Sequence, residues 1–232
     1  MKTIAIILAS GVGARLGLDI PKQFFEIRNK TVLEYSILAF QKHNNIDEII
    51  IVSHPDYISR VEEIVQNGNY SKVSQIIAGG KTRQESSSNG VFAVKETNAK
   101  ILIHDAVRPF VTERIIDDCI TALDEYKAVN VAVESSDTIL EIDDDNCIKS
   151  IPQRKFLRRV QTPQGFDLQT IKKAHYLASK REDLSFTDDC GLVQEFKLAK
   201  VKVIKGEDFN IKITYPSDIK LAETIINICD KI

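Results

Sequence analysis

The chain has 232 residues and a formal net charge of −2, with 31 lysine and arginine residues against 33 aspartate and glutamate residues. This length accommodates one large α/β domain or two small ones, with a sizeable core in either case. Because the two signs of charge are interspersed, the composition argues against a protein that wraps nucleic acid, which would carry a basic excess on one face.

The predicted elements alternate between apolar strands and amphipathic helices. Apolar runs rich in isoleucine and valine occupy residues 3–9, 48–53, 73–78, 100–104 and 129–134. Helical patterns separate these runs, as in residues 112–126, so the order predicts βαβ units. Because the strands are almost continuously apolar, we expect an α/β fold with a mostly parallel sheet covered by helices on both faces.

A glycine-rich turn follows the first strand. Ile4–Leu8 precede Gly11 and Gly13, whose missing side chains let backbone N–H groups face an anion. Arg15 and Lys22 then add positive charge, so the segment suits a triphosphate. The spacing fits neither a dinucleotide motif nor a P-loop, and a plain connection between a strand and a helix is an equal alternative.

A second glycine-rich segment, Gly79-Gly80-Lys81-Thr82-Arg83, follows the third strand. Its glycines permit the close backbone approach by which main-chain groups read a flat base. Arg83 and Ser86 lie one helical turn apart and are candidates for the same site. The alternative is an ordinary helix entry in which Ser86, Ser87 and Ser88 are solvated.

The fourth strand ends in His104-Asp105-Ala106-Val107-Arg108. Since ligands of parallel sheets bind at the carboxyl ends of the strands, we expect this segment to converge with the two glycine-rich turns. Asp105 suits a metal or a hydroxyl and Arg108 suits a phosphate, with a local ion pair between them as the alternative. His104 ends an apolar strand and is expected to be buried and hydrogen-bonded.

The alternation breaks between residues 137 and 165. The stretches DTILEI and CIKSIP flank Asp143-Asp144-Asp145-Asn146, and this pattern predicts a β-hairpin. We interpret residues 1–232 as one domain from which an arm protrudes at about residues 137–158. The basic cluster at residues 154–159 is interpreted as a solvated face.

Two later segments carry polar residues of interest. Thr187-Asp188-Asp189 has the composition of a helix N-terminus with an acidic first turn. Asn210–Thr214 is predicted to be a short strand, on which Lys212 faces solvent unless a phosphate meets it.

The sequence also predicts a location. The N-terminus lacks the pattern of a signal peptide, and no apolar run reaches the ~18 residues of a membrane span, so we expect a cytoplasmic protein without membrane partners. The four cysteines are far apart and form no C-x-x-C pair, which indicates neither a zinc site nor a disulfide framework.

Eight motifs, taken together and in order, resemble the family of CTP-dependent cytidylyltransferases that act on sugar-alcohol phosphates. They are A-S-G-V-G-A-R, P-K-Q, G-G-x-x-R, H-D-A-V-R-P-F, D-T, R-x(7)-T-P-Q-G-F, T-D-D and N-I-K-I-T, and the match runs from Ile4 to about Glu223. The resemblance implies a Rossmann-like nucleotidyltransferase fold with a twisted sheet and a protruding β-arm. It also implies a homodimer that exchanges arms, dependence on Mg²⁺, and CTP and a sugar-alcohol phosphate as substrates.

The resemblance assigns a role to each motif residue. It implies that Arg15, Lys22 and Lys212 are catalytic, and that Asp105 holds the metal. The residues implied to bind CTP are Ala9, Ser10, Gly11, Gly13, Gly79, Gly80, Arg83 and Ser86, with Ser86 as a reader of the base or ribose. Those implied to bind the alcohol phosphate are Asp105, Arg108, Thr138, Arg154, Thr162 and Asp188, with Thr138 and Arg154 supplied by the partner's arm.

The implied chemistry is in-line attack by a phosphate oxygen of the acceptor on the α-phosphorus of CTP, with pyrophosphate as the leaving group. Two anions must approach each other, so Mg²⁺ and cationic side chains must offset their repulsion. Lys22 and Lys212 are the main candidates for stabilising the transition state.

Three questions stay open on the sequence. The motifs straddle two branches, one acting on 2-C-methyl-D-erythritol 4-phosphate and one making CDP-ribitol from ribitol 5-phosphate, and we favour the first. Lys81 stands where the family often has an acidic residue, by the expected cytosine-reading loop, so strictness for CTP is undecided. A non-catalytic nucleotide-binding module is the alternative from another class.

Overall fold

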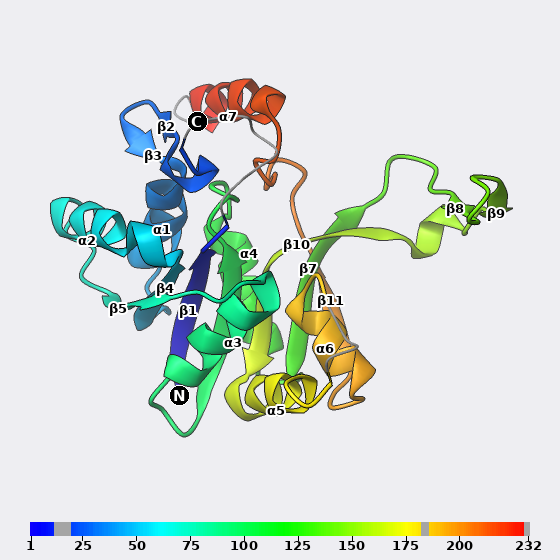
Figure 1. Cartoon of the computed structure of the whole chain (residues 1–232), viewed down its shortest axis with the longest axis horizontal. Coiled ribbons are helices and arrows are strands. Elements are labelled where there is room, and N and C mark those ends of the chain that lie inside the picture. Colours follow the sequence, from blue (N-terminus) through cyan, green and yellow to red (C-terminus); the bar gives the residue numbers. More distant parts are fainter. Residues whose placement is uncertain (12–19, 182–185, 230–232) are drawn as a thin grey trace.

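A computed structural model describes residues 1–11, 20–181 and 186–229, and all structural statements refer to these residues. Its centre is a seven-stranded sheet in the order β11-β7-β10-β6-β1-β4-β5 (Figure 1). The five predicted apolar strands are confirmed, as β1 (Lys2–Ala9), β4 (Glu48–Ser53), β5 (Val73–Ala78), β6 (Ala99–Asp105) and β7 (Ala128–Glu134). They make parallel pairs with their neighbours, except where β10 intervenes.

The prediction missed β10 (Arg158–Asp167), which lies between β6 and β7 and is antiparallel to both. Its buried portion, from Gln161 to Phe166, is largely polar, so it carries no apolar run that would reveal a strand. The sheet is therefore mostly parallel, as predicted for this α/β fold, with β10 as its antiparallel strand. The parallel edge strand β11 (Val201–Lys205) completes it.

Helices cover both faces of the sheet because the side chains of β1 alternate between two apolar cores. Ala5 and Ile7 pack in one core with α1 (Val32–Lys42), α2 (Ile58–Asn67) and α4 (Glu113–Ala122). Ile4 and Ile6 pack in the other with α3 (Arg83–Ala93), α5 (Leu168–Ala178) and α6 (Asp189–Glu195). The helix predicted at 112–126 is α4, which Thr112 caps and which ends at Ala122.

A third, smaller core joins the two chain halves. The short hairpin of β2 (Glu26–Ile27) and β3 (Lys30–Thr31) packs on α7 (Pro216–Cys229) through Ile27, Ala222 and Ile226. Within the described residues, no helix has the length and apolarity that crossing a membrane requires.

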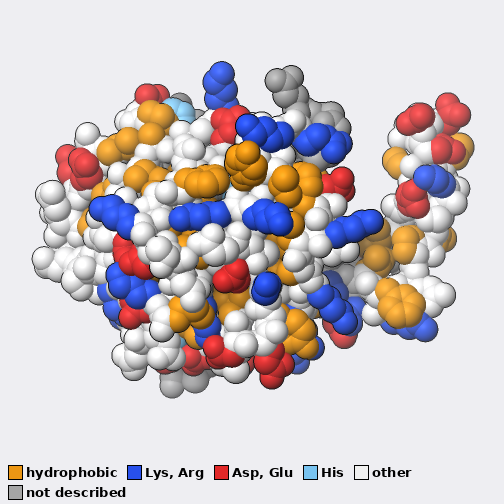
Figure 2. Space-filling model, turned by 90° about the horizontal axis from the view of Figure 1, so that it is seen from below, with side chains coloured by type: hydrophobic (Ala, Val, Ile, Leu, Met, Phe, Trp, Pro, Cys, Tyr) orange, Lys and Arg blue, Asp and Glu red, His pale blue; other side chains and the backbone are white. Residues whose placement is uncertain are grey.

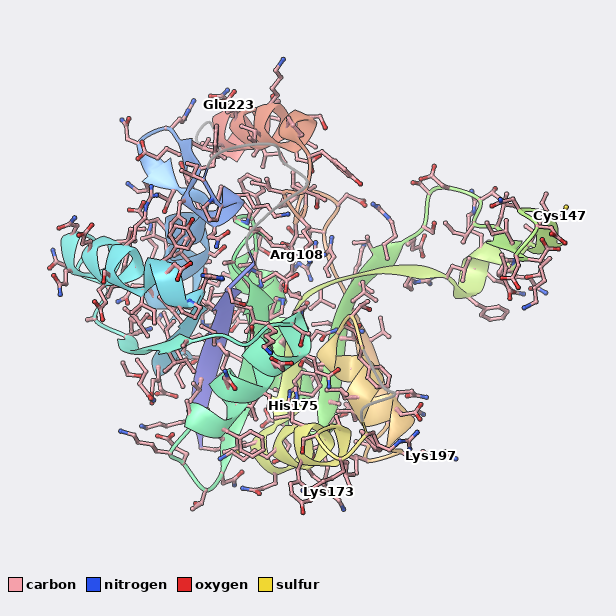
Figure 3. The ribbon with its side chains drawn as sticks, viewed as in Figure 1. Arg108, Cys147, Lys173, His175, Lys197 and Glu223 are labelled. Atoms are coloured by element: carbon pink, nitrogen blue, oxygen red, sulfur yellow. The ribbon has the colours of Figure 1, made fainter. Side chains whose placement is uncertain are left out.

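The predicted hairpin is confirmed as β8 (Glu141–Ile142) and β9 (Ile148–Ser150), which pair antiparallel. Asp143 Oδ1 accepts the backbone N–H groups of Asp145 and Cys147, and Asn146 has a φ of 59°, so the turn uses acidic and amide residues as expected. The 3₁₀ helix η4 (Arg154–Phe156) leads back to β10. The arm extends away from the body, with Cys147 near its tip (Figures 1 and 3).

The short strand predicted at Asn210–Thr214 is wrong. These residues are irregular, and the backbone bond from Ile213 N–H to Val107 O (2.9 Å) ties them to the loop after β6 in place of a ladder. Ile213 is fully buried in the third core, which anchors the segment and holds Lys212 beside the end of β6.

Gly90 lies where α3 packs closely on β1 and β4, so a substitution there tests this packing. A Cβ at this position would lie 2.5 Å from Ile6 Cγ2 and 3.0 Å from Val52 Cγ2. We therefore expect Gly90→Ala to lower the free energy of unfolding by about 1–3 kcal/mol through overpacking. The usual helix preference for alanine over glycine would instead raise it by ~0.5–1 kcal/mol.

The free energy of unfolding is measured by urea denaturation for Gly90→Ala and for a control variant, Ser88→Ala. Ser88→Ala, on the half-buried side of the same helix, should show no loss of stability, since alanine has the higher helix propensity. A Gly90→Ala protein more stable than the wild type would contradict the packing described for α3.

Candidate functional site

A cavity of about 650 Å³ opens at the carboxyl ends of the central strands. The chain segments that follow β1, β4, β5 and β6 all contribute to its lining, as expected for a parallel sheet. Residues distant in sequence complete it, namely Lys22, Phe186, Thr187 and Lys212.

The turn after β1 is fixed from behind by a glutamine. Gln23, which is buried, donates through Nε2 to Ala9 O (2.7 Å) and Gly11 O (3.0 Å). These two carbonyl oxygens are therefore occupied, which reduces the negative charge that the turn presents to an anion. Ala9, Gly11 and Lys22 line the cavity, whereas Gly13 and Arg15 lie outside the described residues.

Asp105 forms the charged centre of the cavity. One carboxylate oxygen accepts from Arg83 Nε at 3.2 Å and the other from Lys212 Nζ at 2.8 Å. Only 6% of Asp105 is exposed. Burial by itself would raise the pKa of this carboxyl, but Arg83 and Lys212 outweigh it and hold the pKa well below its usual range. The predicted alternative, a local Asp105–Arg108 ion pair, is wrong because these two other cations bind the carboxylate.

Arg83 also binds a second carboxylate, Asp189. The sequence assigned this residue to the start of a helix and gave it no role in the site. Arg83 Nη1 lies 2.8 Å from Asp189 Oδ2. The guanidinium lies between the two carboxylates because Thr82 caps α3 and makes Arg83 its first residue. The only sign of this contact in the sequence was the Thr187-Asp188-Asp189 motif, which places two carboxylates next to each other.

The structure gives the two aspartates of that motif different positions. Asp188 caps α6 by accepting the N–H of Gly191 (2.7 Å), and it also accepts from Gln164 Nε2 (3.1 Å). Asp189 points inward to Arg83. The helix start predicted at this motif is confirmed, and Asp188 is not among the residues that line the cavity.

A hydroxyl pair joins the two glycine-rich turns. Ser86 is fully buried, donates to Thr82 O (2.9 Å) and accepts from Gly80 N–H (3.1 Å) and Ser10 Oγ (2.7 Å). Ser86 and Ser87 are both buried, so the alternative of solvated serines is wrong for them. A Cβ at Gly79 would lie 2.5 Å from Ser10 Cβ, so this contact requires glycine.

Ser10, rather than Ser86, reaches the cavity wall. Because the single proton of Ser86 goes to a carbonyl oxygen, the contact between the two hydroxyls uses the proton of Ser10. The lone pairs of Ser10 Oγ are thereby left to accept a hydrogen bond from a ligand.

His104, Arg108 and Thr162 lie beneath the site and hold its backbone. Thr162 accepts the N–H of Asp105 (3.1 Å) and contacts His104 Nδ1 (3.0 Å), while His104 Nε2 lies 2.9 Å from Arg108 O. His104 is thus buried and hydrogen-bonded as predicted, and burial lowers its pKa to about 4. Arg108 donates to the carbonyls of Asn210 (2.8 Å) and Val160 (3.2 Å), which ties the loop after β6 to the segment that carries Lys212.

Thr138 and Arg154 are not brought to the cavity within one chain. Both are exposed in the arm, where Arg154 donates to Ser136 O at 3.1 Å, and neither lines the cavity. Hydrophobic side chains are also exposed along the arm, which stands apart from the body (Figure 2). They are Ile139, Leu140, Ile142, Ile148, Ile151 and Phe156.

The donor set at the cavity fits a hard divalent cation. Asp105 offers carboxylate oxygens at a position where phosphates can supply the remaining ligands, the usual arrangement for Mg²⁺. A second group, His43, Glu113 and Asp117, also has ligand atoms close enough together to hold a metal ion. His43 Nδ1 accepts the N–H of Asn45 (3.2 Å), and His43 Nε2 lies 3.2 Å from Asp117 Oδ1.

Comparisons with known proteins agree with this geometry. The family model described as 2-C-methyl-D-erythritol 4-phosphate cytidylyltransferase matches residues 3–228. A protein of that name from Thermobifida fusca is 40% identical over 97% of this chain and 93% of its own length. The bifunctional ribulose 5-phosphate reductase/CDP-ribitol pyrophosphorylase Bcs1 of Haemophilus influenzae is 43% identical over 97% of this chain, which spans only 48% of that protein.

Solved structures give the same result. The crystal structure of 4-diphosphocytidyl-2C-methyl-D-erythritol synthase from Anaerococcus prevotii superposes with a TM-score of 0.87 at 33% identity, covering 97% of this chain and 96% of that one. The chain therefore belongs to the 2-C-methyl-D-erythritol 4-phosphate cytidylyltransferase family.

Proposed function

We propose that the protein transfers the cytidylyl group of CTP to a sugar-alcohol phosphate, forming a CDP-alcohol and pyrophosphate. The observation that carries this proposal is the cavity itself, in which Arg83 and Lys212 bind Asp105 and Lys22 also lines the wall, in a chain of this family. A cytoplasmic location, where CTP is available, is part of the proposal. The free thiols of Cys119, Cys147 and Cys190 suit a reducing compartment.

The polarity of the cavity supports CTP as one substrate. Its lining includes Asp105 at the end of β6 and Gly80 after β5. The cations around Asp105 suit the phosphates. At the other end, the acceptor lone pairs of Ser10 Oγ suit the amino group of cytosine, which uracil lacks.

The proposed reaction is a single in-line displacement. A phosphate oxygen of the acceptor forms a bond to the α-phosphorus of CTP, and the bond from that phosphorus to the oxygen bridging the β-phosphorus breaks, releasing pyrophosphate. Lys22 and Lys212 stabilise the charge that develops on the phosphate oxygens, and Arg83 orients the triphosphate. Mg²⁺ bound to Asp105 would supply further neutralisation of the phosphates.

The acceptor is assigned to 2-C-methyl-D-erythritol 4-phosphate, because the family model and the T. fusca relative carry that name. A second candidate, ribitol 5-phosphate, is favoured by the 43% identity with the H. influenzae protein that is named a CDP-ribitol pyrophosphorylase.

Pyrophosphate release tests both candidates. The protein is incubated with CTP, Mg²⁺ and each alcohol phosphate in turn, and we expect release with 2-C-methyl-D-erythritol 4-phosphate. Release with ribitol 5-phosphate alone would transfer the assignment to the second candidate. CTP binding without release for any polyol phosphate would contradict the transferase and favour a binding module.

The two lysines of the cavity test the mechanism. Lys22→Ala and Lys212→Ala should each lower kcat by about 10² or more, the scale of removing one donor that stabilises developing charge. Because that charge exists mainly in the transition state, KM should change less than kcat. Lys95→Ala, an exposed lysine outside the cavity, is the matched control and should retain wild-type turnover. Near-normal kcat in either cavity variant would refute its catalytic role.

We further propose a homodimer in which the arm of each protomer completes the partner's site. The exposed apolar side chains of the arm support this, as does the position of Thr138 and Arg154 outside the cavity of their own chain. Self-association would bury the apolar residues.

Mixing inactive variants tests the exchange of arms. Lys212→Ala disables the body and Arg154→Ala disables the arm, and each homodimer should be inactive. In a mixed dimer, the Arg154→Ala body meets an intact arm, so co-refolding equal amounts should restore about a quarter of wild-type activity. If the arm served its own chain, no mixed dimer would contain an intact site and activity would stay absent.

A further inference from the structure

A buried carboxylate that the proposed reaction does not use lies directly behind Arg83. Asp189 is 1% exposed, and its two oxygens have separate partners. Oδ2 lies 2.8 Å from Arg83 Nη1, while Oδ1 accepts from Ser87 Oγ at 2.5 Å and lies 3.3 Å from His175 Nε2.

The group is assembled from four elements of the fold. Ser87 comes from α3, His175 from α5, Asp189 from the start of α6, and Gln164 of β10 accepts the N–H of Asp189 at 3.0 Å. His175 lies where α3, α5 and α6 meet (Figure 3). Burial would raise the pKa of Asp189, but His175, Arg83 and Ser87 lower it, so the carboxylate is charged. Its position is therefore fixed by packed elements rather than by the cavity.

Arg83 is divided between this carboxylate and the one in the cavity. Its Nε serves Asp105 and its Nη1 serves Asp189, and among the described residues no contact engages Nη2. A planar guanidinium held at two of its three nitrogens has a fixed orientation. Since Arg83 lines the cavity, Nη2 can donate to a phosphate oxygen, and little side-chain entropy is lost because the guanidinium is already oriented.

We propose that Asp189 is a positioning residue, which Ser87 and His175 hold in place and which keeps the Arg83 guanidinium turned toward the triphosphate instead of pairing fully with Asp105. This positioning role rests on one part of the proposed function, the binding of a triphosphate in the cavity. Without the charge of Asp189, Arg83 would have one anionic partner, Asp105, and would neutralise the carboxylate that the metal needs.

A double-mutant cycle tests whether Asp189 acts through Arg83. Binding of inorganic tripolyphosphate is measured by calorimetry in the wild type, Arg83→Ala, Asp189→Asn and the double variant, alongside kcat/KM for CTP. Asp189→Asn keeps the size of the side chain but removes its charge and replaces one accepting oxygen with a donating NH2 group, so it should weaken both quantities about tenfold or more. In the Arg83→Ala background the same change should have less than about a twofold effect.

Two further variants separate positioning from folding. Asp167→Ala removes the side chain that caps α5, away from the cavity, and should lower the melting temperature without changing tripolyphosphate affinity. Ser87→Ala leaves the Arg83–Asp189 pair intact but removes one support, and should reproduce the Asp189→Asn pattern with a smaller, about threefold, effect. Ser87→Ala gives the decisive comparison if Asp189→Asn does not fold.

Additive effects of Asp189→Asn and Arg83→Ala, or an unchanged tripolyphosphate affinity in both Asp189→Asn and Ser87→Ala, would overturn the positioning role. A cycle that is non-additive for tripolyphosphate, in a protein that releases no pyrophosphate from CTP, would support the positioning role and contradict the proposed function. The two failures are therefore distinguishable.

Discussion

The site depends on one constraint, the burial of the Asp105 carboxylate at the end of β6. An unpaired buried carboxylate is strongly disfavoured, so the fold must deliver cations to it. Arg83 comes from the start of α3 and Lys212 from an irregular segment more than 100 residues away in sequence. Ile213 anchors that segment, and the loop of Asp105 is held by Thr162 and Arg108. The same contacts that make the carboxylate tolerable therefore gather the charges that a triphosphate needs.

The strands that form this edge were predictable because they are apolar, and β1, β4, β6 and β7 are buried along almost their whole length. Continuous apolar runs can only be satisfied in a sheet covered on both faces, and all five that were predicted are present. β10 escaped because its buried residues are polar and obtain partners from other elements. Gln161 donates to Glu207 O, and Gln164 bonds Asn130 and Asp188. A strand stabilised by side-chain hydrogen bonds has no hydrophobic period, so its place between β6 and β7 follows only from the assembled sheet.

In the site, as in the sheet, some features follow from local sequence and others only from the assembled fold. The polar segments after β5 and β6 were predictable from local composition, because glycine, aspartate and arginine after a strand have direct physical meanings. The pairing of Arg83 with Asp189 was not, since the two residues are 106 positions apart and nothing in local spacing connects them. Within the Asp188-Asp189 doublet, one residue caps a helix and the other enters the core, and only the start of α6 determines which. The engagement of Ser86 by Gly80, Thr82 and Ser10 likewise needs the third dimension.

The position of the arm bears on how two acceptors arise in one family. The described walls of the cavity are largely strand ends and helix starts, and both relatives of about 40% identity match nearly the whole length of this chain. If the proposed CTP site is the same in both relatives, it cannot by itself distinguish two polyol phosphates. Discrimination must come from groups that meet the acceptor, and Thr138 and Arg154 lie on an exposed arm that is free of the packing constraints of the sheet. Under the proposed exchange of arms, substitutions there would change contacts with the acceptor without disturbing the buried charges around Asp105. A fold divided in this way can change its acceptor while it keeps its nucleotide chemistry.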